Sequence, residues 1–304
     1  MHEVLIKENF SLPVQKLFEL GEPTDRWDNW DNYLDLSIGK EHINELLKIV
    51  ENSNDFFNCS LEDELAQNYV YAPIYAWRIL AQLKQKEIIY LLVKLLIADP
   101  DDDWLREDLC NAIREVGPDS IPQVDELLSN YIFDLDFDTQ NNICSNLAEG
   151  LQKIGLLYPN SKAECIKILE KHLSNYQKQG SLINAYICHE LIELNSTESI
   201  DLIRNVFAER NEFGSPIHAD EEHAGDLHNL ELLLGLREKD TEYLNLENER
   251  KRRWEERHRS HRLIYENRLK KIRHLVNFEK SREIKKQKKV NVKKKQKAAR
   301  KRNR

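Results

Sequence analysis

The sequence predicts an all-α fold: antiparallel helix pairs stacked in chain order as an α-solenoid, then a long basic helix and a disordered tail. Two observations predict it. The stretch 71–128 matches itself at a spacing of 33 residues, and apolar residues recur three or four positions apart in both copies. The aligned pairs are Leu80 with Ile113, Leu83 with Val116, Ile88 with Ile121, Leu91 with Val124, and Leu95 with Leu128. One helix pair cannot bury its own apolar face, so neighbouring pairs must stack on it.

The helix signals place a first helix at about 40–52 and four pairs after it. Ser60 and Asp63 resemble a capping box and predict a further helix over 61–70. Pro73 suits the first turn of a helix, and Gly117-Pro118 ends one helix and starts the next. The four predicted pairs cover about 72–97, 102–130, 138–177 and 181–210.

These signals divide the chain into four parts. They are a capping segment 1–39, helical repeats 40–210, an acidic His-containing loop with a short buried segment 211–242, and a basic region 243–304. In the first part, Trp27, Trp30 and Tyr33 are spaced by three residues. We expect them to cover the open apolar edge of the first repeat, as solenoids require. A ligand-binding aromatic cluster is the alternative.

Charge is divided unevenly along the chain. Residues 241–304 hold 25 Lys and Arg against 8 Asp and Glu, a net of +17. The whole chain has 45 Lys and Arg and 53 Asp and Glu. Subtraction leaves 20 Lys and Arg against 45 Asp and Glu for residues 1–240, a net charge of −25. Such asymmetry indicates an acidic body with a basic interaction arm. The stretch 243–285 has the pattern of one long polar helix, and the low-complexity stretch 285–304 is expected to be disordered.

Composition predicts a cytoplasmic protein. No window approaches 18 uncharged apolar residues, so we expect no membrane span, and the N-terminal residues lack the pattern of a secretory signal. The five cysteines are widely spaced, which favours small core residues in a reducing compartment over a redox or metal site. No cofactor is expected.

Two acidic stretches invite a metal hypothesis. DPDDDW (99–104) lacks the turn glycine and distant glutamate of an EF-hand, so acidic capping of the helix at 103–116 is the preferred interpretation over calcium. His218, His223 and His228 lie among acidic residues and form the one cluster with plausible metal-ligand chemistry. Their spacing of five does not place them on one helix face, so we predict a solvated acidic loop and no metal.

Several segments together resemble bacterial proteins with HEAT-like repeats, related to the repeats named after phycobilisome lyases. The resemblance covers most of the chain and rests on these motifs: W-x-x-Y-L-x-L (30–36), YAPIYAWRILAQL (71–83), DDDW (101–104), VGPDSIP (116–122), LINAYICHELIELNSTESIDLIRNVF (182–207), NLELLLGL (229–236) and ARKRNR (299–304). Some relatives carry a C-terminal SEC-C zinc motif. This chain has no cysteine after Cys188, so that zinc site is not carried over. Lyase activity is not carried over either, because many non-enzymes share such repeats and fold does not fix function.

Two functions follow as hypotheses. The first is a non-enzymatic scaffold or adaptor that binds an unknown protein partner through the repeats, while the basic arm contacts RNA, the ribosome or DNA. Docking of the arm on the chain's own acidic body, or a purely solubilising role, is the alternative for the arm. The expected phosphate contacts are Lys285, Lys286, Lys288, Lys289, Lys293, Lys294, Lys295, Lys297, Arg300, Lys301, Arg302 and Arg304.

The second hypothesis is enzymatic. A lyase or chaperone-lyase acting on a chromoprotein would need an acid/base pair in a pocket of the repeat surface. Within the repeats, His189 and Glu190 are the residues that the sequence offers for this role. An ordinary inter-helical position for His189 is the preferred interpretation.

Overall fold

The computed structural model describes residues 7–24, 30–57, 66–131 and 136–238, together with Asn245 and Arg252. Within these ranges every regular element is helical, and the one sheet-type pairing is an isolated antiparallel bridge between Arg210 and Pro216. The predicted all-α class is therefore confirmed for the described part of the chain. Contacts group Met1–Arg237 into one unit and Glu238–Arg304 into another, and all helices described below belong to the first.

Short connections join the consecutive α-helices between residues 72 and 208. The predicted long helix 243–285 and the tail lie outside the described residues, as do Ser60 and Asp63 of the predicted capping box, and Ala66–Tyr71 is a 3₁₀ helix. The α-helices are α1 Leu12–Gln15, α2 Ile43–Glu51, α3 Ser53–Phe57, α4 Ala72–Gln82, α5 Glu87–Ala98, α6 Asp103–Val116, α7 Ile121–Tyr131, α8 Phe137–Leu157, α9 Lys162–Leu173, α10 Ser181–Glu193, α11 Ile200–Ala208, α12 Glu221–Ala224 and α13 Leu227–Leu233.

Helix α6 shows how closely local signals set the ends of an element. The carboxylate of Asp102 accepts a hydrogen bond from the backbone N–H of Leu105 at 2.9 Å, which satisfies one of the free donors of the first turn. The capping interpretation of the acidic stretch is thus confirmed. At the other end Gly117 has φ of 84°, in the region that favours glycine, and Pro118 opens the 3₁₀ turn before α7.

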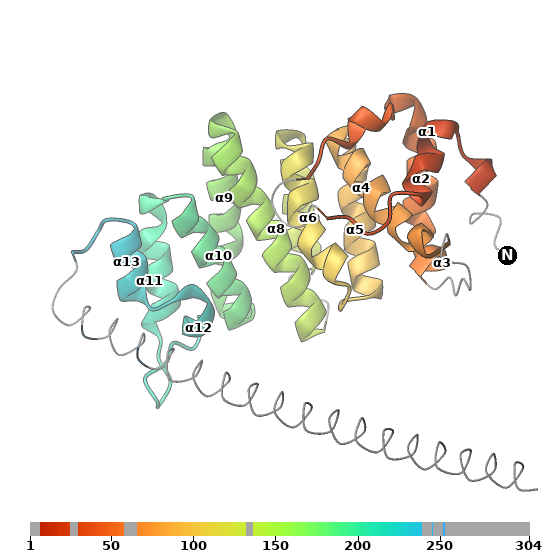
Figure 1. Cartoon of the computed structure of the whole chain (residues 1–304). Helices are drawn as coiled ribbons and strands as arrows, with labels where there is room; N and C mark the ends of the chain where they lie inside the picture. The colour runs from red at the N-terminus through yellow and green to blue at the C-terminus, as the bar shows by residue number, and fades with distance from the viewer. Residues whose placement is uncertain are drawn as a thin grey trace, which may run out of the picture. The chain divides into compact units, whose positions relative to one another are not determined.

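Each of the longer helices packs on helices one and two places away in the chain. Helix α4 contacts α2 and α6, α6 contacts α8, and α8 contacts α10. Helices α5, α7 and α9 pack beside this row, on α6, α8 and α10 in turn. Figure 1 shows α4, α6, α8 and α10 following one another across the first unit. A single apolar core runs through all of them.

The predicted buried positions are correct within α4 and α6, but not at the end of α4 or along most of α5. Leu80 and Ile113 are fully buried, as expected, whereas Leu83 and Leu91 are only half-buried. In α5 the predicted Ile88 is buried, but the buried Leu92 and Leu96 lie one position beyond the predicted Leu91 and Leu95.

The shift comes from the turn between the two helices of a pair. The buried residues Ile89, Leu92 and Leu96 correspond to Ile121, Val124 and Leu128, a spacing of 32 residues. The chain takes nine residues from Leu80 to Ile89 but eight from Ile113 to Ile121, which moves the register by one.

The N-terminal segment packs against the first helices. Tyr33 is buried, Trp30 is partly buried against the core, and Trp27 lies outside the described residues. The Tyr33 hydroxyl accepts a hydrogen bond from the Arg78 guanidinium at 3.2 Å, and its ring meets that of Tyr75 edge-on. These aromatic side chains therefore cover α4.

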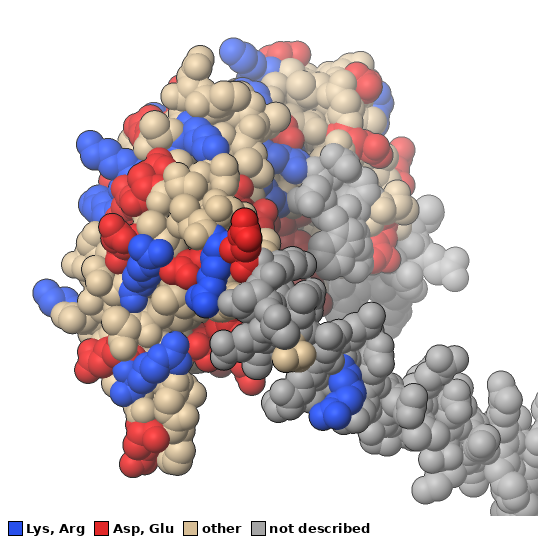
Figure 2. Space-filling view, turned by 90° about the vertical axis from the view of Figure 1, so that its left-hand side faces the viewer, with Lys and Arg blue, Asp and Glu red and all other residues tan. Residues whose placement is uncertain are grey.

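At the other end of the unit, α13 closes the core with one face only. Leu230 and Leu234 are buried, but Leu233 and Leu236 are exposed, so the predicted buried segment is amphipathic. Arg204 of α11 binds Glu231 of α13 at 2.9 Å. On the face that Figure 2 presents, Lys and Arg side chains lie interspersed with Asp and Glu. Such an outer surface suits the end of a helical stack.

Candidate functional site

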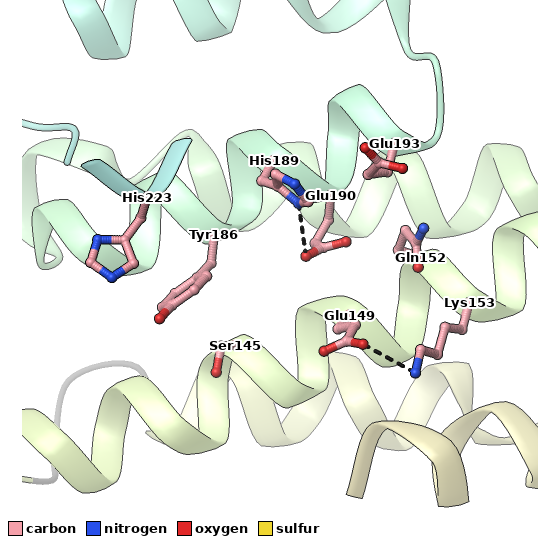
Figure 3. Close-up of a pocket in the computed structure, with 9 residues that line it drawn as sticks. All are labelled: Ser145, Glu149, Gln152, Lys153, Tyr186, His189, Glu190, Glu193 and His223. Carbon is pink, nitrogen blue, oxygen red and sulfur yellow. Dashed lines mark hydrogen bonds and ion pairs between the residues drawn. The ribbon is translucent and has the colours of Figure 1, made fainter. Parts of the chain in front are cut away.

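A pocket of about 530 Å³ lies between α8 and α10, with α12 at one end (Figure 3). Polar and charged side chains from the two long helices face each other across it. We call it the acidic pocket. Its lining residues are Ser145, Glu149, Gln152 and Lys153 of α8, Tyr186, His189, Glu190 and Glu193 of α10, and His223 of α12.

Helical spacing brings these side chains to facing surfaces. On α10, Tyr186, Glu190 and Glu193 are four and three residues apart, which places them on one face. On α8, Glu149 and Lys153 are likewise four apart.

A glycine lets the same two helices come close beside the pocket. Gly155 of α8 has no side chain, and a Cβ at that position would lie 2.6 Å from a methyl carbon of Leu194, just after α10. Close approach at this point holds the facing carboxylates of α8 and α10 within one pocket.

His189 and Glu190 form the central pair of the acidic pocket. The Nδ1 atom of His189 lies 3.4 Å from a carboxylate oxygen of Glu190, and the His189 side chain is half-exposed. The hydrogen bond to Glu190 raises the pKa of the His189 imidazole, and its burial opposes this. Burial raises the pKa of Glu190, which His189 partly offsets. Perturbed pKa values in a hydrogen-bonded pair are a property that acid/base residues share.

Lys153 lies on the wall of the acidic pocket that α8 forms. Its ammonium group contacts the Glu149 carboxylate at 3.1 Å and donates a hydrogen bond to the Asn111 side-chain oxygen at 2.9 Å. It also lies 3.5 Å from the Cys110 sulfur. Burial raises the pKa of Cys110 to about 12, so this thiol is protonated at neutral pH and is a poor nucleophile.

A second, more apolar pocket of about 390 Å³ adjoins the acidic pocket and shares Gln152 and Lys153 with it. Its other lining residues are Arg114 of α6 and Leu156 and Leu157 at the end of α8. Both leucines are more than half-exposed, at 54% and 58%. We call this surface the leucine shelf. Charged and apolar groups are therefore available side by side along α8.

The sequence identified part of this site. His189 and Glu190, the acid/base candidates named from the repeats, both line the acidic pocket. Sequence reasoning missed Glu149, Lys153 and Tyr186, because their role depends on how α8 lies against α10. The shared-face spacing of Tyr186 and Glu190 on α10 was a usable signal.

His218 and His223 of the acidic loop contact different carboxylates. His218 lies 3.1 Å from Glu209, whereas His223 lies 3.3 Å from Asp220. His228 is in the first turn of α13. Over the described ranges, no group of three His, Cys, Asp or Glu side chains is arranged to hold a metal ion.

The twelve predicted phosphate-contacting residues of the tail lie outside the described residues. No helix among the described residues is long and apolar enough to cross a membrane. A scan of family models and searches of curated proteins and of solved structures find no match to this chain. The site is therefore interpreted from its own geometry.

Proposed function

We propose that this chain is a non-enzymatic HEAT-like scaffold or adaptor that binds a protein partner through its helical repeats and a polyanion through its basic C-terminal arm. The order of helix contacts supports the repeat architecture. Stacked antiparallel pairs would bring each first helix against the first helix of the next pair, and α4, α6, α8 and α10 are in contact in that order. Repeat surfaces of this kind present extended binding faces.

The division of charge is the observation that carries the polyanion hypothesis. Residues 241–304 carry a net charge of +17. Twelve Lys and Arg residues lie in the stretch 285–304, which has no acidic or aromatic residue. Such a segment gains affinity for a nucleic-acid backbone by releasing condensed counterions. Without aromatic side chains it offers no base stacking, so we expect little sequence preference.

The test compares the full-length chain with a 1–284 truncation. Fluorescence anisotropy with generic RNA and DNA duplexes should show binding by the full-length chain that is nearly abolished in the truncation. Affinity purification with the same two proteins separates partners that need the arm from partners of the repeats. A protein partner retained by the truncation would belong to the repeats.

A lyase or chaperone-lyase acting on a chromoprotein is the second candidate. One observation favours it: His189 and Glu190, with raised pKa values, line a pocket large enough for part of a substrate. Incubation of the chain with the bilin-free apoprotein of a chromoprotein and the free chromophore tests it. Chromophore transfer that is lost in His189→Gln would establish this function in place of the scaffold.

A further inference from the structure

The acidic pocket and the leucine shelf form one continuous surface along α8. Glu149, Lys153 and Leu156 are four and three residues apart, so all three lie on the same face of that helix. The acidic pocket borders Glu149, the leucine shelf borders Leu156, and both border Lys153. A ligand that entered the acidic pocket would therefore extend onto an exposed apolar surface.

The charges of the acidic pocket favour a cationic group. Three carboxylates line it, from Glu149, Glu190 and Glu193, against the one permanent cation of Lys153. Glu190 is nine-tenths buried, and its carboxylate points across the pocket toward α8 (Figure 3). Glu193 is exposed and has no ion pair with any residue that the structure describes. A bound cation would offset the loss of hydration that burial imposes on the Glu190 carboxylate.

The same walls favour an organic cation over a metal ion. No triad of potential metal ligands is arranged for coordination in the described part of the chain. Tyr186 instead presents an aromatic ring beside the carboxylates, held edge-on against the His223 ring at a centroid distance of 5.7 Å. Carboxylates with a neighbouring aromatic face are a common setting for guanidinium and ammonium groups, which combine ion pairing with cation–π attraction.

We propose that the acidic pocket binds an arginine or lysine side chain of an extended partner peptide, and that the leucine shelf binds an apolar side chain three residues away in the same peptide. This proposal rests on the proposed scaffold function and names the chemistry of its protein partner. The basic residue forms charge-assisted hydrogen bonds with Glu190 and Glu193. The apolar residue covers Leu156 and Leu157.

The spacing of three follows from the two geometries. Glu149 and Leu156 are seven residues apart, and an α-helix rises about 1.5 Å per residue, which separates them by about 10 Å. A peptide extended in the polyproline II conformation rises about 3.1 Å per residue, so three residues cover about 9 Å. That conformation has three residues per turn, so side chains three positions apart point to the same side.

The experiment titrates the full-length chain with short peptides of defined composition. The probe is an acetylated and amidated alanine-based peptide with Arg and Leu three positions apart. In the first control peptide citrulline, which is uncharged and nearly isosteric, replaces Arg; in the second, Ala replaces Leu. Binding is followed by NMR of ¹³C-labelled histidine rings, because His189 and His223 both line the acidic pocket. His189→Gln and His223→Gln assign the two signals.

The expected result is a shift of the His189 signal by the Arg peptide, with affinity about tenfold weaker for the citrulline peptide, since a charged hydrogen bond is lost. Glu190→Gln and Glu193→Gln should each weaken binding of the Arg peptide and leave the affinity for the citrulline peptide unchanged. Glu198→Gln removes one exposed carboxylate outside the pocket and is the matched control. The control peptide with Ala in place of Leu should bind the wild-type chain more weakly than the Arg–Leu probe does.

Three results would overturn the proposal. The first is equal affinity of the Arg and citrulline peptides. The second is no shift of the His189 signal at peptide concentrations of several millimolar. The third is an equal effect of Glu193→Gln and Glu198→Gln on binding of the Arg peptide. None of these results concerns the arm, whose nucleic-acid binding is measured separately. Loss of nucleic-acid binding with the peptide titration intact would count against the polyanion hypothesis alone.

Discussion

At the residue scale, one buried ion pair joins α4 to α6. The Arg78 guanidinium of α4 forms two hydrogen bonds with the Asp108 carboxylate of α6, at 2.7 and 3.0 Å, and both side chains are about 1% exposed. The indole N–H of Trp77 donates a third hydrogen bond to Asp108 at 2.7 Å. The guanidinium lies near the rings of Trp30 and Trp104, at 5.1 and 5.4 Å from their centroids. Aromatic faces and carboxylate together compensate its desolvation.

Removing one partner of this pair should be costly. Asp108→Ala leaves a buried guanidinium without its counter-charge, and we expect a loss of about 3–5 kcal/mol in the free energy of unfolding. Asp103→Ala is the control, because its pair with Arg106 is exposed and should contribute less than about 1 kcal/mol. Urea denaturation measures both. A cost for Asp108→Ala as small as the control's would mean that the pair does not support the fold.

Two histidines should respond to pH in opposite directions. Burial lowers the pKa of His172, although Asp125 lies 2.8 Å from its Nε2 atom. As pH falls below about 6.5, the unfolded chain therefore takes up this proton first, and stability is lost. The hydrogen bond to Glu190 raises the pKa of His189. Its contribution is fully present below about pH 6.5 and is lost as pH rises through the folded-state pKa.

Urea denaturation at about pH 7.5 and about pH 5.5 tests both signs, since these values lie on either side of the pKa of free histidine. The cost of His172→Gln should be smaller at the lower pH, and that of His189→Gln should be larger. Each variant serves as the control for the other. If both costs changed in the same direction, the environment of one histidine would be misassigned.

At the element scale, helix ends were more predictable than helix faces. Helix α6 begins and ends where the acidic stretch 99–104 and Gly117 indicated, because capping is a local property of the chain. Leu91 was expected inside and is half-buried, because the face that α5 buries depends on how the chain turns before it. The acidic pocket was harder still. His189 could be named from the sequence, but Glu149 faces it only through the packing of two helices.

The contact between α6 and α8 depends on a glycine. A Cβ on Gly150 would lie 2.7 Å from two methyl carbons of Ile113, which is fully buried. Gly150→Ala should therefore destabilise by about 1–3 kcal/mol through overpacking, partly offset by the better helix propensity of alanine. Ile113→Ala should cost about 2–5 kcal/mol, as for other buried aliphatic deletions.

The double variant decides whether these two costs share a cause. The methyl group that Gly150→Ala introduces would fill space that Ile113→Ala vacates, so the double variant should cost at least about 0.5 kcal/mol less than the sum of the single variants. Chemical denaturation of the four proteins gives this coupling. Additive costs would indicate that the two sites do not interact and that overpacking against Ile113 is not the cause of the Gly150→Ala cost. Leu83→Ala, at a half-buried position, should cost less than Ile113→Ala.

At the scale of the whole molecule, opposite charges compete for the same arm. The net of −25 over residues 1–240 attracts the net of +17 over residues 241–304, so self-docking and polyanion binding use the same side chains. On the face in Figure 2 the acidic side chains are dispersed among basic ones. A nucleic-acid backbone instead concentrates its phosphates along a line. We therefore expect nucleic acid to displace the body at low salt.

Salt dependence measures how many arm residues take part. If about six phosphates are neutralised on duplex DNA, the logarithm of the binding constant should fall against the logarithm of salt concentration with a slope near about −5. Truncation to 1–284 removes twelve Lys and Arg residues and should flatten this slope, because fewer counterions are released. Fluorescence anisotropy at several salt concentrations gives both slopes, and thermal denaturation should show the same cooperative transition in both proteins. Equally weak binding by the two proteins at about 50 mM salt, where screening is modest, would assign the arm to the acidic body or to a protein partner.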